Sequence, residues 1–384
     1  MRTSTDRILT THVGSLPRTQ ALVDALLQKD RGEVSDWPAY DRTISDAVDQ
    51  VVRRQVEVGI DVPSDGEASK VSYSTYMMDR LEGFGGHSPR MPALDLAPYP
   101  DFRAKMARMT GVQEFKRASC IAPIKVKSWA PLHQDIANMK AAMGRHGVQQ
   151  GFMNSASPGL ITAFQPNAYY ATHEDYVWAL AEVMAEEYEA IVAAGLVVQL
   201  DCPDLAMAHH TGFQDLGEAE FVKRCELHVE AMNHALWNVP AQMARFHVCW
   251  GNYEGPHDFD IDLIKILPAI LKAKPQGILF EAANARHQHE RTVWAEAKLP
   301  QDKVLIPGLI DSCSNYVEHP ELVAQRVERF AAIVGRERVL AGTDCGFGTF
   351  AGYGKLDGEI AYKKLKALAE GAAIASRRLW AKAA

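Results

Sequence analysis

Several features that would place the chain in a simple class are missing from its sequence. No run of about 18 apolar residues occurs, so we expect no membrane-spanning helix. The first residues also lack the apolar core of a signal peptide. No block of Lys or Arg is present, and the net charge of −7 disfavours a nucleic-acid binder. The six cysteines are scattered along 384 residues, unlike the dense pattern of a small disulfide-linked domain. We therefore expect a globular protein of a reducing, cytoplasmic compartment.

Short apolar runs alternate with helical patterns along most of the chain. With 47% hydrophobic and 23% charged residues, the chain can bury a large core. Eight runs have the character of strands: 8–17, 59–67, 151–158, 196–201, 245–251, 278–281, 303–310 and 339–345. The helical patterns cover 20–29, 173–194, 218–237, 260–273, 289–298, 320–334 and 357–382, and a further long helix runs from a capped start at 35–39 to about 58. This alternation predicts a (β/α)8 TIM barrel. A doubly wound open sheet is the competing interpretation, but it more often shows a Gly-rich phosphate turn after its first strand.

One stretch departs from this alternation. Residues 83–100 are rich in Gly and Pro, and residues 119–129 have the pattern of a strand or hairpin. We expect residues 83–130 to form an insertion or lid after the second βα unit. The chain as a whole, 1–384, is then a single barrel domain.

A histidine and a cysteine lie two residues apart in Arg245-Phe-His-Val-Cys-Trp-Gly251. Side chains at i and i+2 of a strand share a face, so His247 and Cys249 should project together. Two later runs end in Glu281 and Cys345. Barrel active sites lie at the carboxyl ends of the strands, so all four side chains belong to one mouth. A single His or Cys at a strand end is usually filler, but the joint placement predicts a zinc site, because Zn²⁺ prefers imidazole and thiolate.

Further motifs accompany this set in a fixed order along the chain. They are Thr10-Thr-His-Val-Gly-Ser-Leu-Pro17, Asp65-Gly-Glu67, Gln199-Leu-Asp201 and Thr343-Asp-Cys-Gly346. Together with the metal set they resemble the catalytic barrel of cobalamin-independent methionine synthase. That superfamily also includes the epoxyalkane:coenzyme M transferases. The chain is too short for the duplicated barrel of the long enzymes, so it resembles the short, single-barrel members.

The resemblance implies a zinc-dependent S-alkyltransferase, in which a zinc-bound substrate thiolate attacks the carbon of an alkyl donor. A cationic metal keeps a coordinated thiol deprotonated at neutral pH. His247, Cys249, Glu281 and Cys345 are the implied ligands, and Glu281 is the one expected to loosen when the substrate sulfur enters. Methyl transfer to homocysteine is the first expectation.

The resemblance also assigns residues to the substrate. In methionine synthases two acids hold the homocysteine ammonium, and a Gly-Ser turn holds its carboxylate. By motif these are Glu67 and Asp201, and Gly14 and Ser15. Simpler interpretations stay open, since Asp201 could cap a turn and Glu67 could be a surface carboxylate.

Epoxide opening by coenzyme M is the alternative reaction, favoured by the chain length and by loops 250–257 and 311–319. It needs a general acid for the developing alkoxide. The candidates are His257, Tyr253 and His319, with Tyr316 as a further one. The sulfonate of coenzyme M would need a cation, for which Lys70, Arg18 and Arg286 are available. Phe164 occupies the region where the long enzymes place a tryptophan on the pterin, which puts a folate donor in doubt.

Two other classes remain open. A metal-free barrel resembling uroporphyrinogen decarboxylase would need arginines for its many carboxylates, and the net acidity argues against it. A zinc-stabilised barrel without catalysis predicts unfolding on metal removal. Other residues are interpreted as lying outside the metal set: His209, His210, the stretch 286–289, Cys313, Cys120, Cys202 and Cys225. The sequence specifies neither the alkyl donor nor the oligomeric state.

Overall fold

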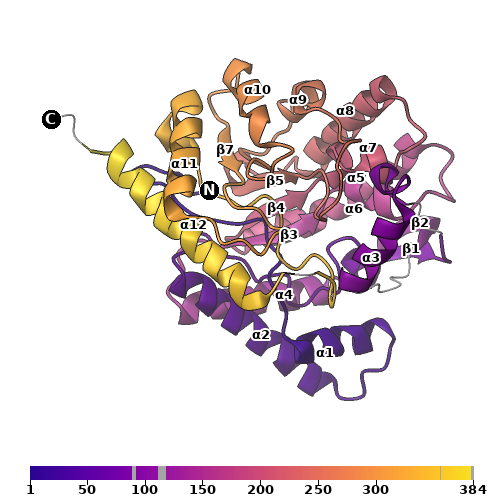
Figure 1. The fold of residues 1–384 in the computed structure, drawn as a ribbon. Helices are drawn as coiled ribbons and strands as arrows, with labels where there is room; N and C mark the ends of the chain where they lie inside the picture. Colours follow the sequence, from indigo (N-terminus) through magenta and orange to yellow (C-terminus); the bar gives the residue numbers. More distant parts are fainter. Residues whose placement is uncertain (89–91, 111–117, 355, 382–384) are drawn as a thin grey trace.

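The computed structural model describes residues 1–88, 92–110, 118–354 and 356–381. It is an α/β structure in which helices surround a parallel sheet (Figure 1). The strands are β1 Leu81–Gly85, β2 Ser119–Val126, β3 Phe152–Ala156, β4 Val197–Asp201, β5 Ala244–Val248, β6 Gly277–Phe280 and β7 Val304–Pro307. The helices are α1 Gln20–Asp30, α2 Trp37–Glu57, α3 Pro100–Thr110, α4 Ala130–Arg145, α5 Pro158–Phe164, α6 His173–Ala193, α7 Ala208–Thr211, α8 Glu218–Ala235, α9 Leu263–Ile270, α10 Arg291–Glu296, α11 Pro320–Val334 and α12 Gly358–Leu379. None of the helices in these ranges combines the length and apolarity that crossing a membrane requires.

The central sheet is parallel, with its strands in sequence order from β3 to β7. Every residue of these strands is buried, as expected for a parallel sheet covered on both faces. The register pairs Ala156 with Asp201, and Asp201 with His247. The carboxyl ends of the strands therefore meet along one edge.

Extended segments continue this sheet on both sides through backbone hydrogen bonds. Segment 339–343 bonds to β7 and to segment 8–13, and segment 60–64 bonds to β3 and again to segment 8–13. The bonds run from Leu340 N to Leu305 O, Thr11 N to Ala341 O, Phe152 N to Pro63 O, and Val62 N to Thr10 O. Each N···O distance is between 2.9 and 3.1 Å. The sequence of contacts thus runs from β7 back to β3 through three short segments.

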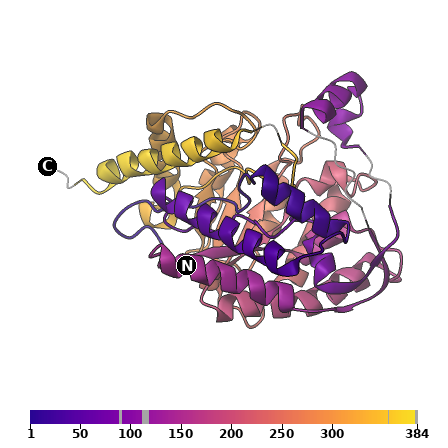
Figure 2. The same ribbon diagram turned by 90° about the horizontal axis from the view of Figure 1, so that it is seen from below.

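Local sequence explains the helices that flank the sheet. In α2 the Asp36 carboxylate accepts a hydrogen bond from the Ala39 N–H and so caps the first turn. Ile44, Val48 and Val52, four residues apart, form its buried stripe. α6 begins with a reciprocal capping box between Thr172 and Asp175. α1 and α2 lie side by side (Figures 1 and 2).

An antiparallel pair lies outside the central sheet. β1 pairs with β2, and a 3-10 turn, η2 (Leu94–Leu96), and α3 lie between them in the sequence. We refer to residues 92–110 as the cover segment. Its helix α3 lies at the edge of the molecule, apart from α1, α2 and α4 (Figure 2).

A buried arginine crosses the interior of the sheet. Arg245 of β5 donates to the Thr11 hydroxyl at 3.0 Å and to the His12 carbonyl at 3.1 Å. Its guanidinium also lies 3.7 Å from the ring centroid of Phe152. A fully desolvated cation is costly unless its donors are satisfied, so these contacts tie β5 to segment 8–13.

A second buried cation joins β1 to the helices. Arg80, directly before β1, lies 2.6 Å from the Asp135 carboxylate of α4 and 2.9 Å from the Glu187 carboxylate of α6. The Tyr76 and Ser155 hydroxyls donate to Glu187, each at 2.7 Å. Burial raises the pKa of Glu187, but Arg80 and these donors bring it below its ordinary value. Glu187 is therefore ionised, and Arg80 forms ion pairs with both carboxylates.

Removing the cation of this cluster should destabilise the whole protein. Arg80→Met leaves two buried carboxylates without a partner, and breaking a buried ion pair on one side costs about 3–5 kcal/mol. Urea denaturation measures the loss. Arg53→Met is the matched control, because Arg53 pairs with Glu57 at the surface and is worth about 1 kcal/mol or less. Equal losses in the two variants would contradict the assignment.

The sequence predicted the five strands of the central sheet and most of the long helices, and the structure confirms them. The predicted strands at 8–17, 59–67 and 339–345 are not full strands in the structure. They join the sheet through isolated β-bridges. Expected helices 260–273 and 289–298 are shorter, as α9 and α10: α9 begins only at Leu263, and a 3-10 turn, Gln288–Glu290, precedes α10. Helices α3, α4 and α5 were not predicted. The expected end of the last helix, at residue 382, lies outside the described residues.

Candidate functional site

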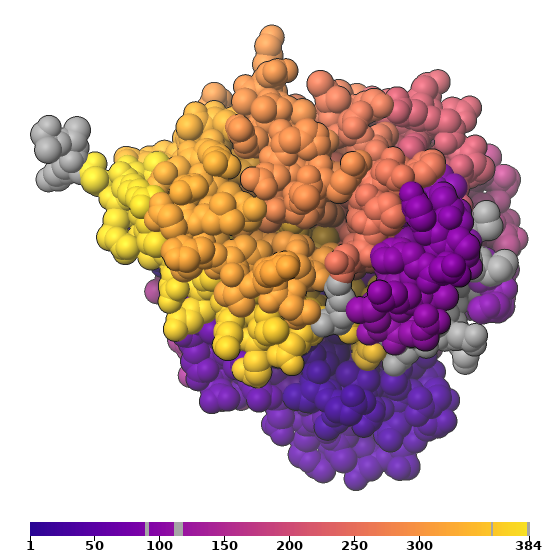
Figure 3. All heavy atoms as spheres, in the orientation of Figure 1, coloured from indigo at the N-terminus to yellow at the C-terminus, as the bar shows by residue number. Residues whose placement is uncertain are grey.

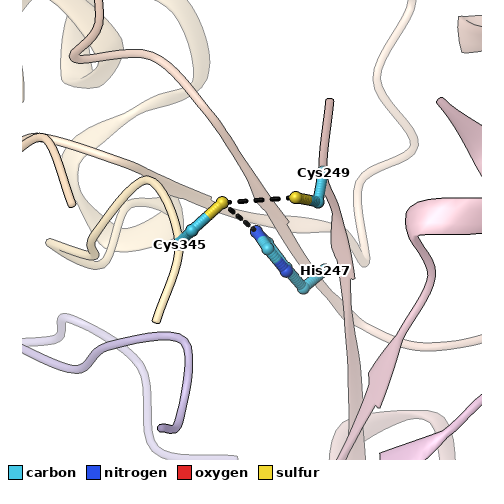
Figure 4. Close-up of side chains that lie close together, drawn as sticks. All are labelled: His247, Cys249 and Cys345. Atoms are coloured by element: carbon cyan, nitrogen blue, oxygen red, sulfur yellow. Dashed lines mark hydrogen bonds between the residues drawn. The ribbon is translucent and has the colours of Figure 1, made fainter. Parts of the chain in front are cut away.

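Three metal-binding side chains converge at the carboxyl ends of the strands. The Sγ atoms of Cys249 and Cys345 are 3.3 Å apart, and Cys345 Sγ lies 3.9 Å from His247 Nε2. One ligand atom of each residue lies within 4.8 Å of the others. His247 and Cys249 come from the end of β5, Cys345 comes from the loop opposite, and the side chains point toward one another (Figure 4). We call these residues the thiol–imidazole cluster.

Glu281, the residue after β6, lies next to this cluster. Its Oε1 atom is 3.6 Å from Cys345 Sγ and accepts the Trp250 N–H at 2.7 Å. Its Oε2 accepts from the Asn284 side chain at 2.7 Å. The structure therefore brings the four predicted metal residues together, with the carboxylate held by hydrogen bonds on both oxygens.

Asp344 sets the shape of the loop that carries Glu281. Its carboxylate accepts the N–H groups of Ala282 and Ala283 at 2.8 Å each and of Asn284 at 2.9 Å. Its carbonyl accepts a hydrogen bond from His247 Nε2 at 2.9 Å if that nitrogen carries the proton. Carboxylates and carbonyls that orient ligating side chains are a common part of metal sites.

Burial controls protonation in the cluster. It lowers the pKa of His247 to about 4, so the ring is neutral, the form that binds metals. Burial raises the pKa of the Cys345 thiol well above its ordinary value. The hydrogen bond with Cys345 lowers the pKa of Cys249, but burial and Glu281 outweigh it and the net change is upward. A divalent cation held by these donors would reverse both thiol shifts, because it stabilises the thiolate.

Two buried acids, Glu67 and Asp201, line the cavity that also contains the thiol–imidazole cluster. Burial, opposed by Lys70 and reinforced by Asp201, raises the pKa of Glu67 to about 8. Burial also raises the pKa of Asp201 to about 6, against hydrogen bonds from Asn154 at 3.1 and 3.2 Å. Glu67 Oε2 is buried and has no hydrogen-bond partner among the described residues. We call Glu67 and Asp201 the acid pair; its carboxylates are suited to a cationic ligand.

The backbone at Glu67 is strained. Its φ of 55° is in the left-handed region, which costs of the order of 1 kcal/mol for a residue other than glycine. The Asp65 carboxylate accepts the Glu67 N–H at 3.0 Å, and Arg18 donates to the Glu67 carbonyl at 2.9 Å. These contacts hold the conformation that directs the side chain into the cavity.

The turn at Gly14 and Ser15 lies near the acid pair. A Cβ atom on Gly14, whose φ is 145°, would lie 2.1 Å from the Asn154 side-chain oxygen, so only glycine fits. The Gly14 N–H donates to His12 Nδ1 at 3.1 Å and is therefore engaged within the protein. Ser15 lines the cavity, and its hydroxyl accepts the Gly348 N–H at 3.4 Å.

A single cavity of about 490 Å³ contains the thiol–imidazole cluster, the acid pair and Ser15. Its outer wall is largely apolar and includes aromatic rings in edge-to-face or tilted contact. The Tyr73 ring lies 5.6 Å from both Phe164 and Phe350, and Phe350 lies 5.8 Å from Tyr353. A mostly apolar cavity with a few convergent polar groups is typical of a small-molecule site.

Comparison with known proteins agrees with this geometry. A family model described as the catalytic domain of cobalamin-independent synthase matches residues 8–89. A methionine synthase of Saccharolobus solfataricus is 25% identical over 375 residues, which cover 96% of this chain and 95% of that protein. A methionine synthase of Thermococcus kodakarensis is 24% identical over 372 residues, covering 96% and 94%.

A solved structure, a B12-independent methionine synthase from Shewanella sp. W3-18-1 in complex with selenomethionine, aligns with a TM-score of 0.75 and 18% identity. The alignment covers 98% of this chain and 100% of that one. The chain is thus similar over nearly its whole length to cobalamin-independent methionine synthases. A putative B12-independent methionine synthase from Listeria monocytogenes has the same kind of fold, with a TM-score of 0.64 and 20% identity.

Of the three predicted general acids, one, Tyr253, lines this cavity, and His257 and His319 are not among its lining residues. Tyr253 lines the cavity, but its hydroxyl donates to Asp95 of the cover segment. His257 bonds through one ring nitrogen to Asp260 at 3.0 Å and through the other to the Tyr253 carbonyl at 2.9 Å. His319 is exposed and caps α11. Their catalytic role stays a prediction.

The cations considered for a sulfonate are differently placed. Lys70 is buried and donates to the Asn154 carbonyl at 2.7 Å, Arg18 holds backbone carbonyls, and Arg286 is exposed. Cys313 donates to the Asn252 side chain at 3.2 Å. His210 is buried against the Trp250 carbonyl.

Sequence reasoning missed Asp344, Asn284 and Asp95. Asp344 stands inside a motif that was noted only for its cysteine, so adjacency to a ligand was the available signal. No comparable signal marked Asn284 or Asp95.

The acid pair should make the protein less stable as the pH rises. The pKa of Glu67 is about 8 in the folded state and near 4.5 when unfolded, so between these values the folded state binds more protons and loses stability with rising pH. Glu67→Gln removes this titration, and we expect the variant to exceed wild type at pH 8 by roughly 2 kcal/mol. Urea denaturation at pH 5 and pH 8 measures the difference. Exposed Glu296→Gln is the control, and a Glu67→Gln effect that does not depend on pH would contradict the prediction.

Proposed function

We propose that this chain is a zinc-dependent methyltransferase that transfers a methyl group to the thiol of homocysteine. The thiol–imidazole cluster carries the proposal, because it lies in the same cavity as an acid pair suited to an ammonium group. The naming of its relatives as methionine synthases supports the reaction class. A soluble fold of one barrel domain is part of the proposal: segments 8–13, 60–64 and 339–343 supply the remaining strands of a (β/α)8 barrel. Residues 83–130 are then its insertion.

The donor set fits zinc. A neutral imidazole, two thiols and the Glu281 carboxylate are the ligand types of zinc sites, and two thiolates favour zinc over Mg²⁺ or Mn²⁺. We assign His247, Cys249, Glu281 and Cys345 as the ligands. When bound, Zn²⁺ would lower the pKa of a substrate thiol and keep it ionised at neutral pH.

The protein's own residues position the substrate. Glu67 and Asp201 would receive the homocysteine ammonium, and its positive charge would lower both of their raised pKa values, so protons leave as the amine binds. Ser15 would receive the carboxylate at the turn before Pro17. Held at both ends, the amino acid would direct its thiol toward the cluster. The apolar wall around Phe164 and Phe350 would exclude water from the reacting carbon.

The coenzyme M alternative is not favoured. Its sulfonate would need a cation directed into the cavity, whereas Lys70 and Arg18 are committed to backbone carbonyls. The relatives described above are named methionine synthases. The metal-free decarboxylase class is likewise not favoured, since the superfamily is that of the cobalamin-independent synthases.

Loss of either thiol should abolish metal binding without unfolding the protein. We expect about one zinc per chain in wild type and a stoichiometry near zero in Cys249→Ala and Cys345→Ala, because three or four ligands are needed to hold the ion. Elemental analysis measures zinc, and circular dichroism checks the fold. Cys225→Ala, in α8, is the control and should keep its metal. Wild-type protein that takes up no metal would refute the assignment, and unfolding on chelation would indicate a structural site.

The acid pair should determine which thiol binds. We expect zinc-loaded wild type to bind homocysteine roughly tenfold or more tightly than 4-mercaptobutanoate, which lacks only the amine, because charged hydrogen bonds are lost. Glu67→Gln and Asp201→Asn should remove this preference. Calorimetry in buffers of different ionisation enthalpy also measures the released protons. Coenzyme M serves as the third thiol, and tighter binding of coenzyme M than of homocysteine would overturn the proposed acceptor.

A further inference from the structure

The cover segment, residues 92–110, is weakly anchored to the rest of the protein. Its helix α3 has no buried residue along its whole length. Phe102 and Met109 are 39% and 57% exposed, which is unusual for large apolar side chains. Within the segment, Asp95 and Leu96 of the turn η2 are buried. The attachment of the segment therefore depends on η2 and not on the packing of α3.

The same segment forms one wall of the cavity. Leu96, Arg103, Met106 and Thr110 line it, opposite the thiol–imidazole cluster. In the space-filling view the purple surface of the cover segment adjoins the coral surface of the loop after β5 (Figure 3). Movement of α3 would thus change access to the site without disturbing the central sheet.

Asp95 crosses from the cover segment to that loop. One of its oxygens, Oδ2, accepts the Tyr253 hydroxyl and also the His257 N–H, the latter at 3.1 Å. The ring centroids of Tyr253 and His257 lie 4.4 Å apart, so the Tyr253 hydroxyl and the backbone N–H of His257 are held in one place. Burial would raise the pKa of Asp95, but His210, Tyr253 and the His257 backbone lower it to about 2. An ionised carboxylate with two donors is a strong contact.

The second oxygen of Asp95 is less well satisfied. Oδ1 lies 3.7 Å from His210 Nδ1, and both buried atoms lack a hydrogen-bond partner among the described residues. His210 Nε2 is held by the Trp250 carbonyl at 3.0 Å. A buried polar atom left without a partner costs free energy, so half of the Asp95 contact is strong and half is incomplete. A carboxylate with one well-bonded oxygen and one unpartnered oxygen suits a contact that breaks and re-forms.

Two other contacts fix the ends of the segment. The Gln214 side chain donates to the Pro92 carbonyl at 2.7 Å, and the Gly354 N–H donates to the Thr110 carbonyl at 3.0 Å. Both are neutral hydrogen bonds, worth about half of a charge-assisted one. Asp95 thus supplies the charged, buried attachment near the start of the segment, in η2 before α3.

We propose that Asp95 is a latch: it holds the cover segment closed over the cavity through Tyr253 and His257, and its release opens the cavity to ligands. The latch acts on access and does not depend on which thiol or donor is used. It also gives Tyr253 and His257 a positioning role, since they carry the latch on the loop that begins directly after Cys249.

Amide hydrogen exchange of α3 tests the latch in the full chain without any ligand. Asp95→Asn keeps the shape and removes the charge, and Tyr253→Phe removes one donor. We expect each variant to exchange about tenfold faster than wild type in residues 97–110, because a charge-assisted hydrogen bond is lost. Trypsin, which can cleave after Arg103, Lys105 and Arg108 of α3, should cut faster in the same variants.

Asp101→Asn, an exposed carboxylate on the same helix, is the matched control and should behave as wild type. The double variant of Asp95 and Tyr253 should exchange no faster than the faster single one, because both remove one shared contact. Exchange in α3 equal to that of Asp101→Asn would overturn the proposal. Faster exchange throughout the central sheet would also overturn it, because Asp95 would then support global stability. Zinc content that stays unchanged separates this result from failure of the proposed catalytic site.

Discussion

Parallel pairing of β4 with β5 is the constraint on which the site depends. It sets Asp201 directly beside His247, so the last residue of one strand and the face of the next that carries His247 and Cys249 come to the same edge. The pairing of β5 with β6 then brings Glu281, one residue beyond Phe280, to the level of Cys249. Asp201, His247, Cys249 and Glu281 therefore meet at one edge, and the loops that carry Glu67 and Cys345 complete the cavity.

Sharing the cavity has an energetic cost that the fold offsets elsewhere. Glu67 and Asp201 are both acidic and buried, and burial raises the pKa of each carboxyl group. Glu67 also occupies a strained backbone conformation. Arg80 pairs with Asp135 and Glu187, and Arg245, on the same face of β5 as His247, donates to Thr11 and His12. The charge of Arg80 is thus paired in the folded protein, whereas Glu67 Oε2 has no hydrogen-bond partner among the described residues.

The parts of the fold and the site that could be predicted from the sequence are those whose elements have a regular apolar periodicity. Strands with an apolar run and a polar end fixed the positions of His247, Cys249 and Glu281, because alternation along a strand decides which side chains share a face. The family motifs located Glu67 and Asp201. Asp344 was not recognised because its role is to accept three backbone N–H groups of a loop 60 residues earlier, and no sequence pattern encodes that fold of the loop.

The cover segment was predicted only as an insertion, for a related physical reason. α3 has no buried stripe, so the apolar periodicity that reveals α2 or α6 is absent from it. Asp95 gains its partners from residues more than 150 positions away, and a lone aspartate after Pro92 and Ala93 carries no local mark of burial.

The positions of Tyr253 and His257 show how such tertiary contacts change a functional interpretation. The sequence offers them only as candidate proton donors for the opening of an epoxide, which needs a general acid. In the structure the Tyr253 hydroxyl donates a hydrogen bond to Asp95. The two ring nitrogens of His257 are hydrogen-bonded to Asp260 and to the Tyr253 carbonyl. A hydroxyl whose hydrogen bond already goes to a carboxylate is a poor proton donor toward a ligand. Epoxide opening forms an alkoxide that must take up a proton, so a loop whose tyrosine and histidine are already hydrogen-bonded within the protein is poorly suited to it.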